Sequence, residues 1–526
     1  MKSVWRVLIS SAMATVLLCS PAWAQKRGGT MVMAVAGEPS AIVGFLHSDT
    51  GGFVVASNIF SGLIGMDFNY NPTPNLAERW DISPDGLAYM FHLYKTAKFH
   101  DGKPVTAHDV EYTFNEAVAK YHPSRGSWWP NVESAKAIDD HTFRFQLKQP
   151  SPAFLINLAY ELRSGGLILP KHLYAGTDPS RNPFNDKPIG SGPFKVVKWV
   201  KGSHVELERH ASFHLSGRPY LDRLIIQFVP DPATRILAFE RGDIDFIDST
   251  AVPHNELKRL SRDARFKIMS GRDAIGVLGM LLINVRRPAL QDVRVRQAIA
   301  YALDVDDISD KALFSAGRGP RSVVASNQGW AFTDKYFAYK RDVAKANAML
   351  DDAGVPRGAD GTRFKLSVAW TAGRSYDGKA AELIRDQLRD VGIAVDVRVF
   401  DRPSFIQKVF ADWDFDAAVQ LISTGPDPSI SVATRFHTKQ INRAPFTNGM
   451  GYSNPQLDDI FDRDAAELDR SRRQAYWDEA QKILMRDLPA IPLFELPDGH
   501  LANAKLENIA NGPFGYFESR HEAYFR

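Results

Sequence analysis

In the first half of the chain, several short stretches alternate apolar and polar positions with a period of two. Such alternation predicts β-strands that bury one face. The stretches are residues 31–35, 87–94, 142–147, 194–199 and 205–209. The last two are close enough in sequence to pair as a hairpin. We also expect a strand over 221–230 and a helix over 234–241 that ends at Gly242.

Apolar residues recur with the spacing of an α-helix in two parts of the chain. Thr106 and Asp109 form a capping-box pattern, and apolar residues then recur on one helical face as far as Tyr121. From about residue 280, strands alternate with longer helices. The predicted strands are 281–285, 364–370 and 394–400, and the predicted helices are 293–303, 342–352, 378–391 and 469–486. This βαβ order predicts an α/β fold with a parallel or mixed sheet covered by helices.

Residues 1–24 have the pattern of a secretory signal peptide. Lys2 and Arg6 precede an apolar run of about a dozen residues, which ends in small residues at a cleavage site after Ala24. Cys19 is the one cysteine of the sequence. It could suggest lipidation, but Leu18 stands where a lipid-attachment site needs a small residue, so we assign Cys19 to the leader. The protein is therefore expected in the periplasm.

Length and charge narrow the class of protein. About 500 residues remain after the leader, which predicts two or three domains. The formal net charge is +3, and removing the leader, with its two basic residues and no acid, lowers it to about +1. A nearly neutral surface gives no reason to expect a nucleic acid or an anionic membrane as partner.

Short motifs follow one another in a recognisable order along the whole chain. They are NLAERW (75–80), SPDG (83–86), FHL (91–93), FHDGKP (99–104), TAHDV (106–110), GSGPF (190–194), RGDID (241–245), DVRVRQA (292–298) and IPLF (491–494). This series resembles the signature of the family 5 extracellular solute-binding proteins, the peptide- and nickel-binding receptors of ABC importers.

The resemblance implies a bilobal, type II-like periplasmic-binding-protein clamshell with the ligand buried between two α/β lobes. Lobe I would comprise residues 25–60, 190–275 and 490–526, and lobe II residues 276–489. An extra domain, residues 61–189, would be inserted in lobe I. Hinge closure around the ligand would then signal to the membrane permease.

The turn before the predicted helix at 378–391 is the first candidate binding site. Gly373 to Lys379 is spaced like a P-loop, but Ala380 stands where a nucleotide-binding loop has Ser or Thr, so we reject nucleotide binding. A helix N-terminus is nevertheless favourable for an anion. In dipeptide-binding relatives an arginine here pairs with the ligand's carboxylate, and Arg374 matches it. The alternative is an ordinary surface arginine.

Asp427 and three tryptophans complete the candidate ligand residues. In peptide-binding relatives an Asp near position 427 accepts hydrogen bonds from the peptide's amine. Asp427 matches the later Asp-Pro of those relatives better, so it is either a ligand residue or a turn residue. Trp128, Trp129 and Trp330 lie on predicted loops, where they would either stack on a ligand or pack into the core.

The sequence contains no motif that indicates catalysis or metal binding. No nucleophile elbow appears, and His210 and His214 are the only histidines at a ligand-like spacing. We therefore expect no metal, no cofactor and no enzymatic activity. The leading hypothesis is a monomeric import receptor for a small peptide or peptide-like solute, with ABC permease subunits as partners. The alternatives are the same fold carrying an opine, a sugar conjugate or a chelated metal, a secreted hydrolase, or a structural, chaperone-like envelope protein.

Overall fold

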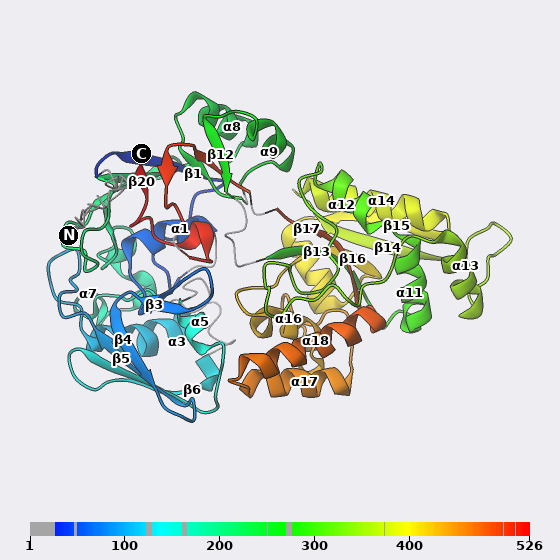
Figure 1. The fold of residues 1–526 in the computed structure, drawn as a ribbon, viewed down its shortest axis with the longest axis horizontal. Helices are drawn as coiled ribbons and strands as arrows, with labels where there is room; N and C mark the ends of the chain where they lie inside the picture. The colour runs from blue at the N-terminus through cyan, green and yellow to red at the C-terminus, as the bar shows by residue number, and fades with distance from the viewer. Residues whose placement is uncertain are drawn as a thin grey trace, which may run out of the picture.

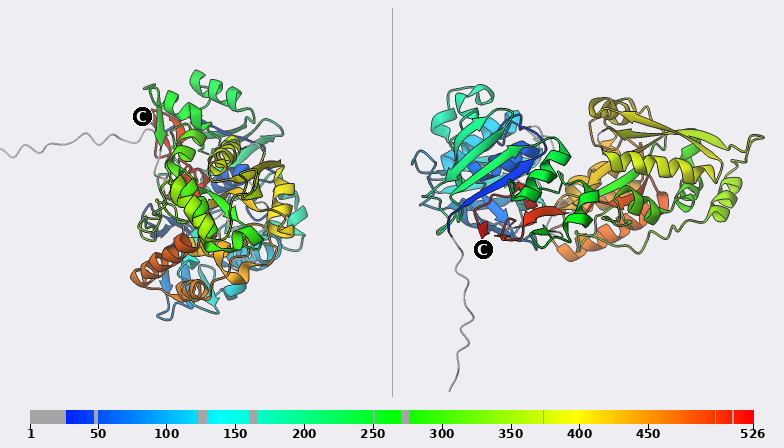
Figure 2. Two further views of the ribbon diagram at one scale, coloured as in Figure 1. Left: turned by 90° about the vertical axis from the view of Figure 1, so that its right-hand side faces the viewer. Right: turned by 90° about the horizontal axis from the view of Figure 1, so that it is seen from above.

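The computed structural model describes residues 27–46, 50–122, 129–159, 166–249, 251–269, 276–372, 374–497, 499–510 and 512–526. These residues form two lobes that lie side by side (Figure 1). Seen from above, the lobes are separate bodies that meet at a narrower middle (Figure 2). No helix in the described ranges is long and apolar enough to cross a membrane.

The first lobe is built on a seven-stranded mixed sheet of order β12-β18-β11-β1-β10-β9-β8. The strands are β1 (Thr30–Val35), β8 (Phe194–Val200), β9 (His204–Arg209), β10 (Arg223–Phe228), β11 (Phe246–Ile247), β12 (Phe266–Met269) and β18 (His500–Asn503). β1 runs parallel to β10 and β11, and β8 and β9 form the predicted hairpin. The helices are α1 (Thr50–Ile59), α8 (Pro232–Arg241) and α9 (His254–Leu260).

An inserted unit follows α1 in sequence and carries a core of its own. Its strands are β2 (Ile64–Met66), β3 (Pro72–Pro74), β4 (Ala77–Ile82), β5 (Ala88–Leu93), β6 (Val132–Ala137) and β7 (Thr142–Leu147). Its helices are α2 (Ala107–Tyr112), continued by a π-helical turn (Thr113–Val118) and α3 (Ala119–Tyr121), then α5 (Phe154–Ala159) and α7 (Lys171–Tyr174). The predicted capping box is confirmed: Thr106 N donates to Asp109 Oδ2 at 2.8 Å.

The GSGPF motif fastens this unit to α1 by close backbone contact. A Cβ atom on Gly190 would lie 2.0 Å from the carbonyl oxygen of Ile59, and one on Gly192 would lie 2.6 Å from its carbonyl carbon. Gly192 N donates to Ile59 O at 2.8 Å. Glycine is therefore required because the two chains approach too closely for any side chain.

The second lobe has a five-stranded sheet of order β15-β14-β16-β13-β17. Its strands are β13 (Val277–Ile283), β14 (Phe364–Thr371), β15 (Ile393–Phe400), β16 (Ala417–Ser423) and β17 (Ala490–Glu495). Its helices are α10 (Pro288–Gln291), α11 (Val293–Ala302), α12 (Val305–Ala312), α13 (Val343–Asp352), α14 (Ser375–Arg389), α15 (Arg402–Ile406), α16 (Pro428–Phe436), α17 (Pro455–Ala466) and α18 (Arg470–Asp487). In Figure 1, α12 and α14 lie above the sheet, and α17 and α18 lie below it.

The chain passes between the lobes twice, between β12 and β13 and between β17 and β18. β17 pairs with β13 in the second lobe's sheet and is buried along its whole length. Residues 490–495, which the sequence analysis assigns to lobe I, therefore lie in the second lobe. The physical reason is that this buried strand, apolar from Ala490 to Phe494, has its pairing partner there.

The C-terminal segment returns to the first lobe and completes its sheet. β18 lies between β11 and β12 and pairs with both. Two short strands follow, β19 (Leu506–Glu507) and β20 (Tyr524–Phe525), which pair with one another. Arg520 is fully buried, donates to the carbonyl oxygens of Ile509 and Gly515, and its backbone N–H binds Asn58 Oδ1 of α1. The last residues are thus packed into the body of the lobe.

Candidate functional site

Both interlobe segments join the second lobe at one edge of its sheet. The loops that follow three of its strands lie at the same edge. β14 runs parallel to β15 and β16, so the carboxyl ends of these three strands share one edge. β13 begins and β17 ends at the same edge, because Val277 pairs with Ser423 and Leu278 pairs with Glu495. In open α/β sheets, ligands bind outside the carboxyl ends of parallel strands. This edge is therefore the first place to look for a site.

Arg374 lies at this edge, in the turn between β14 and α14. It is the N-cap residue of α14, which begins at Ser375, three residues earlier than predicted. Its side chain is 24% exposed, and its Nη1 lies 3.7 Å from Asp377 Oδ2. The guanidinium thus adds a full positive charge to the positive end of a 15-residue helix. Both features favour an anionic group at this turn.

Asp377 lies in the same turn, and no motif in the sequence marks it as a site residue. Its side chain is fully buried, and among the residues that the structure describes neither carboxylate oxygen has a hydrogen-bond partner. Burial raises the pKa of Asp377 to about 7, although the charge of Arg374 opposes the rise. Asp377 directly precedes the predicted helix 378–391, and only the fold shows that it lies in the first turn of α14 and is buried.

The two lobes touch near the Arg374 turn. The ring of Tyr376, in the first turn of α14, meets the ring of His254 of the first lobe edge to face, with centroids 5.5 Å apart. Burial lowers the pKa of His254 to about 4, so this ring is neutral at physiological pH. A second contact joins the inserted unit to lobe II, where Gln328 Nε2 donates to Tyr70 Oη at 3.1 Å. The Arg374 turn therefore belongs to the interlobe face.

Asp427 is engaged within the second lobe. It caps α16 by accepting from Ser429 N at 3.0 Å, and Arg473 donates to both of its carboxylate oxygens. Burial would raise the pKa of Asp427, but the charge of Arg473 outweighs it and holds the pKa below the ordinary value. These contacts satisfy the carboxylate without a ligand, as the turn-residue interpretation expects.

The predicted tryptophans are not gathered around Arg374. Trp330 is half-buried in lobe II, where the guanidinium carbon of Arg473 lies 4.8 Å from its ring centroid. Trp129 is half-buried in the inserted unit and stacks on Phe114, with centroids 6.2 Å apart and planes 5° from parallel. Trp128 lies outside the described residues. Trp330 and Asp427 thus share Arg473 as a neighbour, whereas Trp129 packs against the core of the insert.

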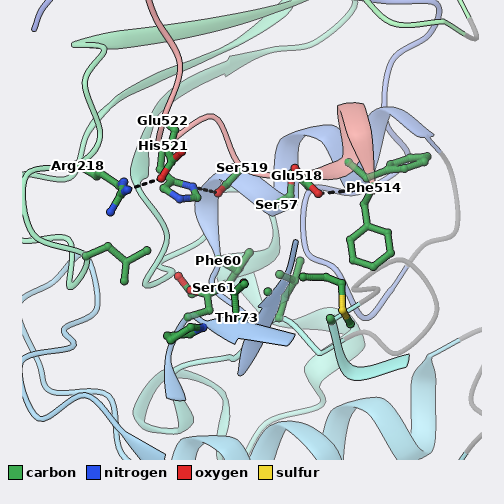
Figure 3. Close-up of a pocket in the computed structure, with 18 of the residues that line it drawn as sticks. Ser57, Phe60, Ser61, Thr73, Arg218, Phe514, Glu518, Ser519, His521 and Glu522 are labelled. Carbon is green, nitrogen blue, oxygen red and sulfur yellow. Dashed lines mark hydrogen bonds and ion pairs between the residues drawn. The ribbon is translucent and has the colours of Figure 1, made fainter. Parts of the chain in front are cut away.

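A cavity of about 410 Å³ lies wholly within the first lobe and its insert (Figure 3). Its walls come from α1, the β2–β3 hairpin, the segment 213–218 and the segment 514–522. Phe53, Phe60, Met66, Leu167 and Phe514 are among its apolar lining residues. Its volume is within the range of small-molecule sites. It was not predicted, since its walls come from parts of the sequence far from one another.

The charged side chains of this cavity have partners within the protein. Arg218 forms an ion pair with Glu522, and Ser519 Oγ lies 2.6 Å from His521 Nδ1, as Figure 3 shows. Glu518 accepts from the backbone N–H groups of Gly512 and Phe514. Burial lowers the pKa of His521 to about 3, so this ring is neutral. The cavity is therefore suited to an uncharged, largely apolar group.

No cluster of three or more histidine, cysteine or acidic side chains in the described part of the chain could hold a metal ion. The two histidines singled out by their spacing have other surroundings. His210 Nδ1 lies 3.1 Å from Gly192 O, and the ring of His214 packs against Tyr94. Both rings lie among the elements that fasten the GSGPF motif to the insert.

Comparison with known proteins gives a consistent result. The profile described as "Bacterial extracellular solute-binding proteins, family 5 Middle" matches residues 71–443. The oligopeptide-binding protein AppA of Bacillus subtilis is 29% identical over 498 residues, which cover 91% of this chain and 88% of AppA. The glutathione-binding protein GsiB of Pectobacterium atrosepticum is 27% identical, with 92% of each chain covered.

Solved structures show the same architecture. The structure of Bacillus subtilis AppA with a nonapeptide superimposes with a TM-score of 0.78 at 26% identity, covering 95% of this chain and all of AppA. The structure of AgaA from Agrobacterium tumefaciens with agropinic acid superimposes with a TM-score of 0.76 at 25% identity, covering 95% of this chain and 99% of AgaA. The predicted bilobal α/β fold is thereby confirmed.

Proposed function

Because the chain belongs to the bacterial extracellular solute-binding proteins of family 5, we propose that it is the periplasmic receptor of an importer for peptides or peptide-like solutes that carry a carboxylate. The protein is a solute-binding component of an ABC transporter and not an enzyme. In this proposal it acts as a monomer and delivers its solute to the permease subunits. Residues 1–24 direct it across the inner membrane and are removed.

The observation that carries the proposal is the position of Arg374. The side chain stands at the carboxyl edge of β14, at the N-terminus of α14, beside the contact between Tyr376 and His254. A planar guanidinium binds a carboxylate through two parallel hydrogen bonds. A solute held by Arg374 would lie against the first lobe, so that closure of the lobes would enclose it.

The first-lobe cavity supports a solute that also has an uncharged part. Its aromatic and aliphatic walls would accept a side chain or another apolar group, and its charged side chains already have partners within the protein. A receptor with a cation on one lobe and an apolar cavity in the other fits the composition of a peptide.

The state of Asp427 favours a second candidate, a carboxylate solute without a free amine. Arg473 already neutralises the carboxylate of Asp427, the residue nearest to the amine-binding acid of the peptide-binding relatives. A solute such as an opine needs no amine acceptor at that place. The solved relative AgaA, whose structure contains agropinic acid, belongs to the same structural group.

The deciding experiment is native mass spectrometry of the protein purified under mild conditions from the periplasm of expressing cells. A series of peptide masses released from the protein would support the peptide receptor. One defined non-peptide carboxylate would support the second candidate. A released solute without any carboxylate would overturn both, and a solute that leaves chemically changed would contradict the receptor role.

A further inference from the structure

A second arginine, Arg402, lies beside Arg374 at the edge of the lobe II sheet. Thr371 at the end of β14 is in register with Phe400 at the end of β15, and Ala372 N donates to Phe400 O at 2.8 Å. Arg374 follows β14 by three residues, and Arg402 follows β15 by two. The surrounding protein and the charge of Arg374 both lower the pKa of Arg402. The two cations are therefore close enough to repel each other.

The aromatic ring of Phe446 contacts Arg402 and a third arginine, Arg435. The guanidinium carbon of Arg402 lies 5.5 Å from the ring centroid of Phe446, and that of Arg435 lies 5.4 Å from the same centroid. Phe446 has a positive φ of 62°, and Arg443 in the same loop has a φ of 60°. Such backbone is costly for a bulky residue and tends to occur at functional sites. This loop therefore presents the ring of Phe446 to Arg402 and Arg435.

The acids near Arg402 are already engaged elsewhere. Asp401 caps α15 by accepting from Ser404 N and Oγ at 2.8 and 2.9 Å. Asp377 is buried beside Arg374. Among the residues that the structure describes, no carboxylate lies within 4.0 Å of the Arg402 guanidinium, which is itself exposed. Arg402 thus has a neighbouring cation and no carboxylate partner among the described residues, an arrangement that favours the binding of an anion beside it.

We propose that Arg402, supported by Phe446 and Arg435, binds a second anionic group of the solute whose carboxylate Arg374 binds. The imported solute is then a compound with two carboxylates a few ångströms apart, such as a peptide with an acidic residue at its carboxyl end or a dicarboxylate conjugate. This inference rests on the proposed function and sharpens it, because it makes the receptor selective for acidic over neutral solutes.

The test is a competition experiment with matched peptides. The purified protein is emptied of its solute and offered an equimolar mixture of di- and tripeptides of alanine that end in Glu, Gln, Asp or Asn. The retained peptides are then quantified by native mass spectrometry. We expect the acidic peptides to be retained roughly ten- to a hundredfold over their amide counterparts, the range for a charge-assisted hydrogen bond.

Variants of the protein test whether Arg402 causes the preference for acidic peptides. Arg402→Gln should lose the preference for acidic peptides and still bind the amide peptides, whereas Arg402→Lys should retain part of it. Arg398→Gln is the matched control, since Arg398 lies on β15, just before Arg402 in the chain, is exposed and is paired with Asp396. Thermal unfolding of each variant verifies that it is folded.

The outcomes separate this inference from the function on which it rests. If the protein retains acidic and amide peptides equally, or if Arg402→Gln keeps the preference, the second anionic subsite is wrong and the peptide receptor stands. If the unaltered protein retains no peptide of either kind, the peptide function fails and this inference fails with it.

Discussion

Arg473 holds the carboxylate of Asp427 through two hydrogen bonds, from Nη1 to Oδ2 at 2.7 Å and from Nη2 to Oδ1 at 2.8 Å. Its Nε also donates to Asp464 at 2.9 Å, and all three side chains are at least 95% buried. One arginine therefore balances two acids inside the second lobe. An acid that the motif alone offers as a ligand residue is in this protein part of a buried network.

Replacing Asp427 should reduce stability and leave solute affinity unchanged. Breaking a buried ion pair from one side costs roughly 3–5 kcal/mol, and Asp427→Asn should fall at the low end because Asp464 still faces Arg473. Urea unfolding measures the loss. Asp459→Asn, which removes an exposed partner of Arg463, should change stability by less than about 1 kcal/mol. Weaker binding at unchanged stability would instead identify Asp427 as a ligand residue.

Replacing Arg374 should weaken binding of the carboxylate solute without unfolding the lobe. Arg374→Gln should raise the dissociation constant roughly ten- to a hundredfold, since one charge-assisted interaction is lost. Isothermal titration calorimetry with the solute released from the protein measures the change. Arg385→Gln, on the exposed face of the same helix, is the control. An equal loss of affinity for the amide form of the solute would show that Arg374 does not bind the carboxylate.

Asp377 should make stability depend on pH. Its pKa rises from 3.8 in the unfolded chain to about 7 in the fold, so the folded state binds the additional proton between these values. Stability should therefore fall as pH rises from about 4 to 8, by up to roughly 4 kcal/mol for this group. Asp377→Asn should remove this loss, and thermal unfolding between pH 5 and 8 measures it.

The control for Asp377 is an acid of the same helix that is exposed. Asp386→Asn removes an exposed carboxylate of α14 and should shift the unfolding temperature equally at every pH. The gain of Asp377→Asn over the unaltered protein should instead grow from pH 5 to pH 8. A gain that is independent of pH would mean that Asp377 is ionised in the fold even at pH 5.

Gly190 should be irreplaceable for steric reasons. A Cβ at this position would lie 2.0 Å from Ile59 O, so Gly190→Ala must push α1 and the GSGPF motif apart. We expect a loss of at least about 3 kcal/mol, the upper range for overpacking. Gly329→Ala is the matched control because nothing lies within 4 Å of its built Cβ. Equal stability of the two variants in urea would contradict this explanation.

Much of the fold was predictable because its elements have a clear period. The alternating strands and amphipathic helices such as α11 and α13 lie close to their predicted bounds. α1 was not found, since it is buried on all sides and has no polar face to set a period. β17 was placed in the wrong lobe because an apolar strand does not reveal its pairing partner. Local pattern thus predicts the elements, while their neighbours depend on topology.

The candidate site was predictable only where a motif marks it. Arg374 stands before a helix, and the structure places it at the N-terminus of α14 as expected. No motif marks Asp377 or Arg402. Asp377 is distinguished by its burial, and Arg402 by lying beside Arg374 because β14 and β15 are neighbouring strands. The apolar cavity combines segments more than 400 residues apart, such as α1 and 514–522. Their proximity in the fold cannot be predicted from a single sequence.

The position of β18 in the first-lobe sheet has a consequence for how the chain reaches its folded state. This strand comes from the last 27 residues yet lies between two strands of the sheet, and Arg520 closes the core against α1. The first lobe therefore cannot be completed while the C-terminus is still being synthesised. A chain truncated before residue 500 would leave the edges of β11 and β12 open to pairing with other molecules.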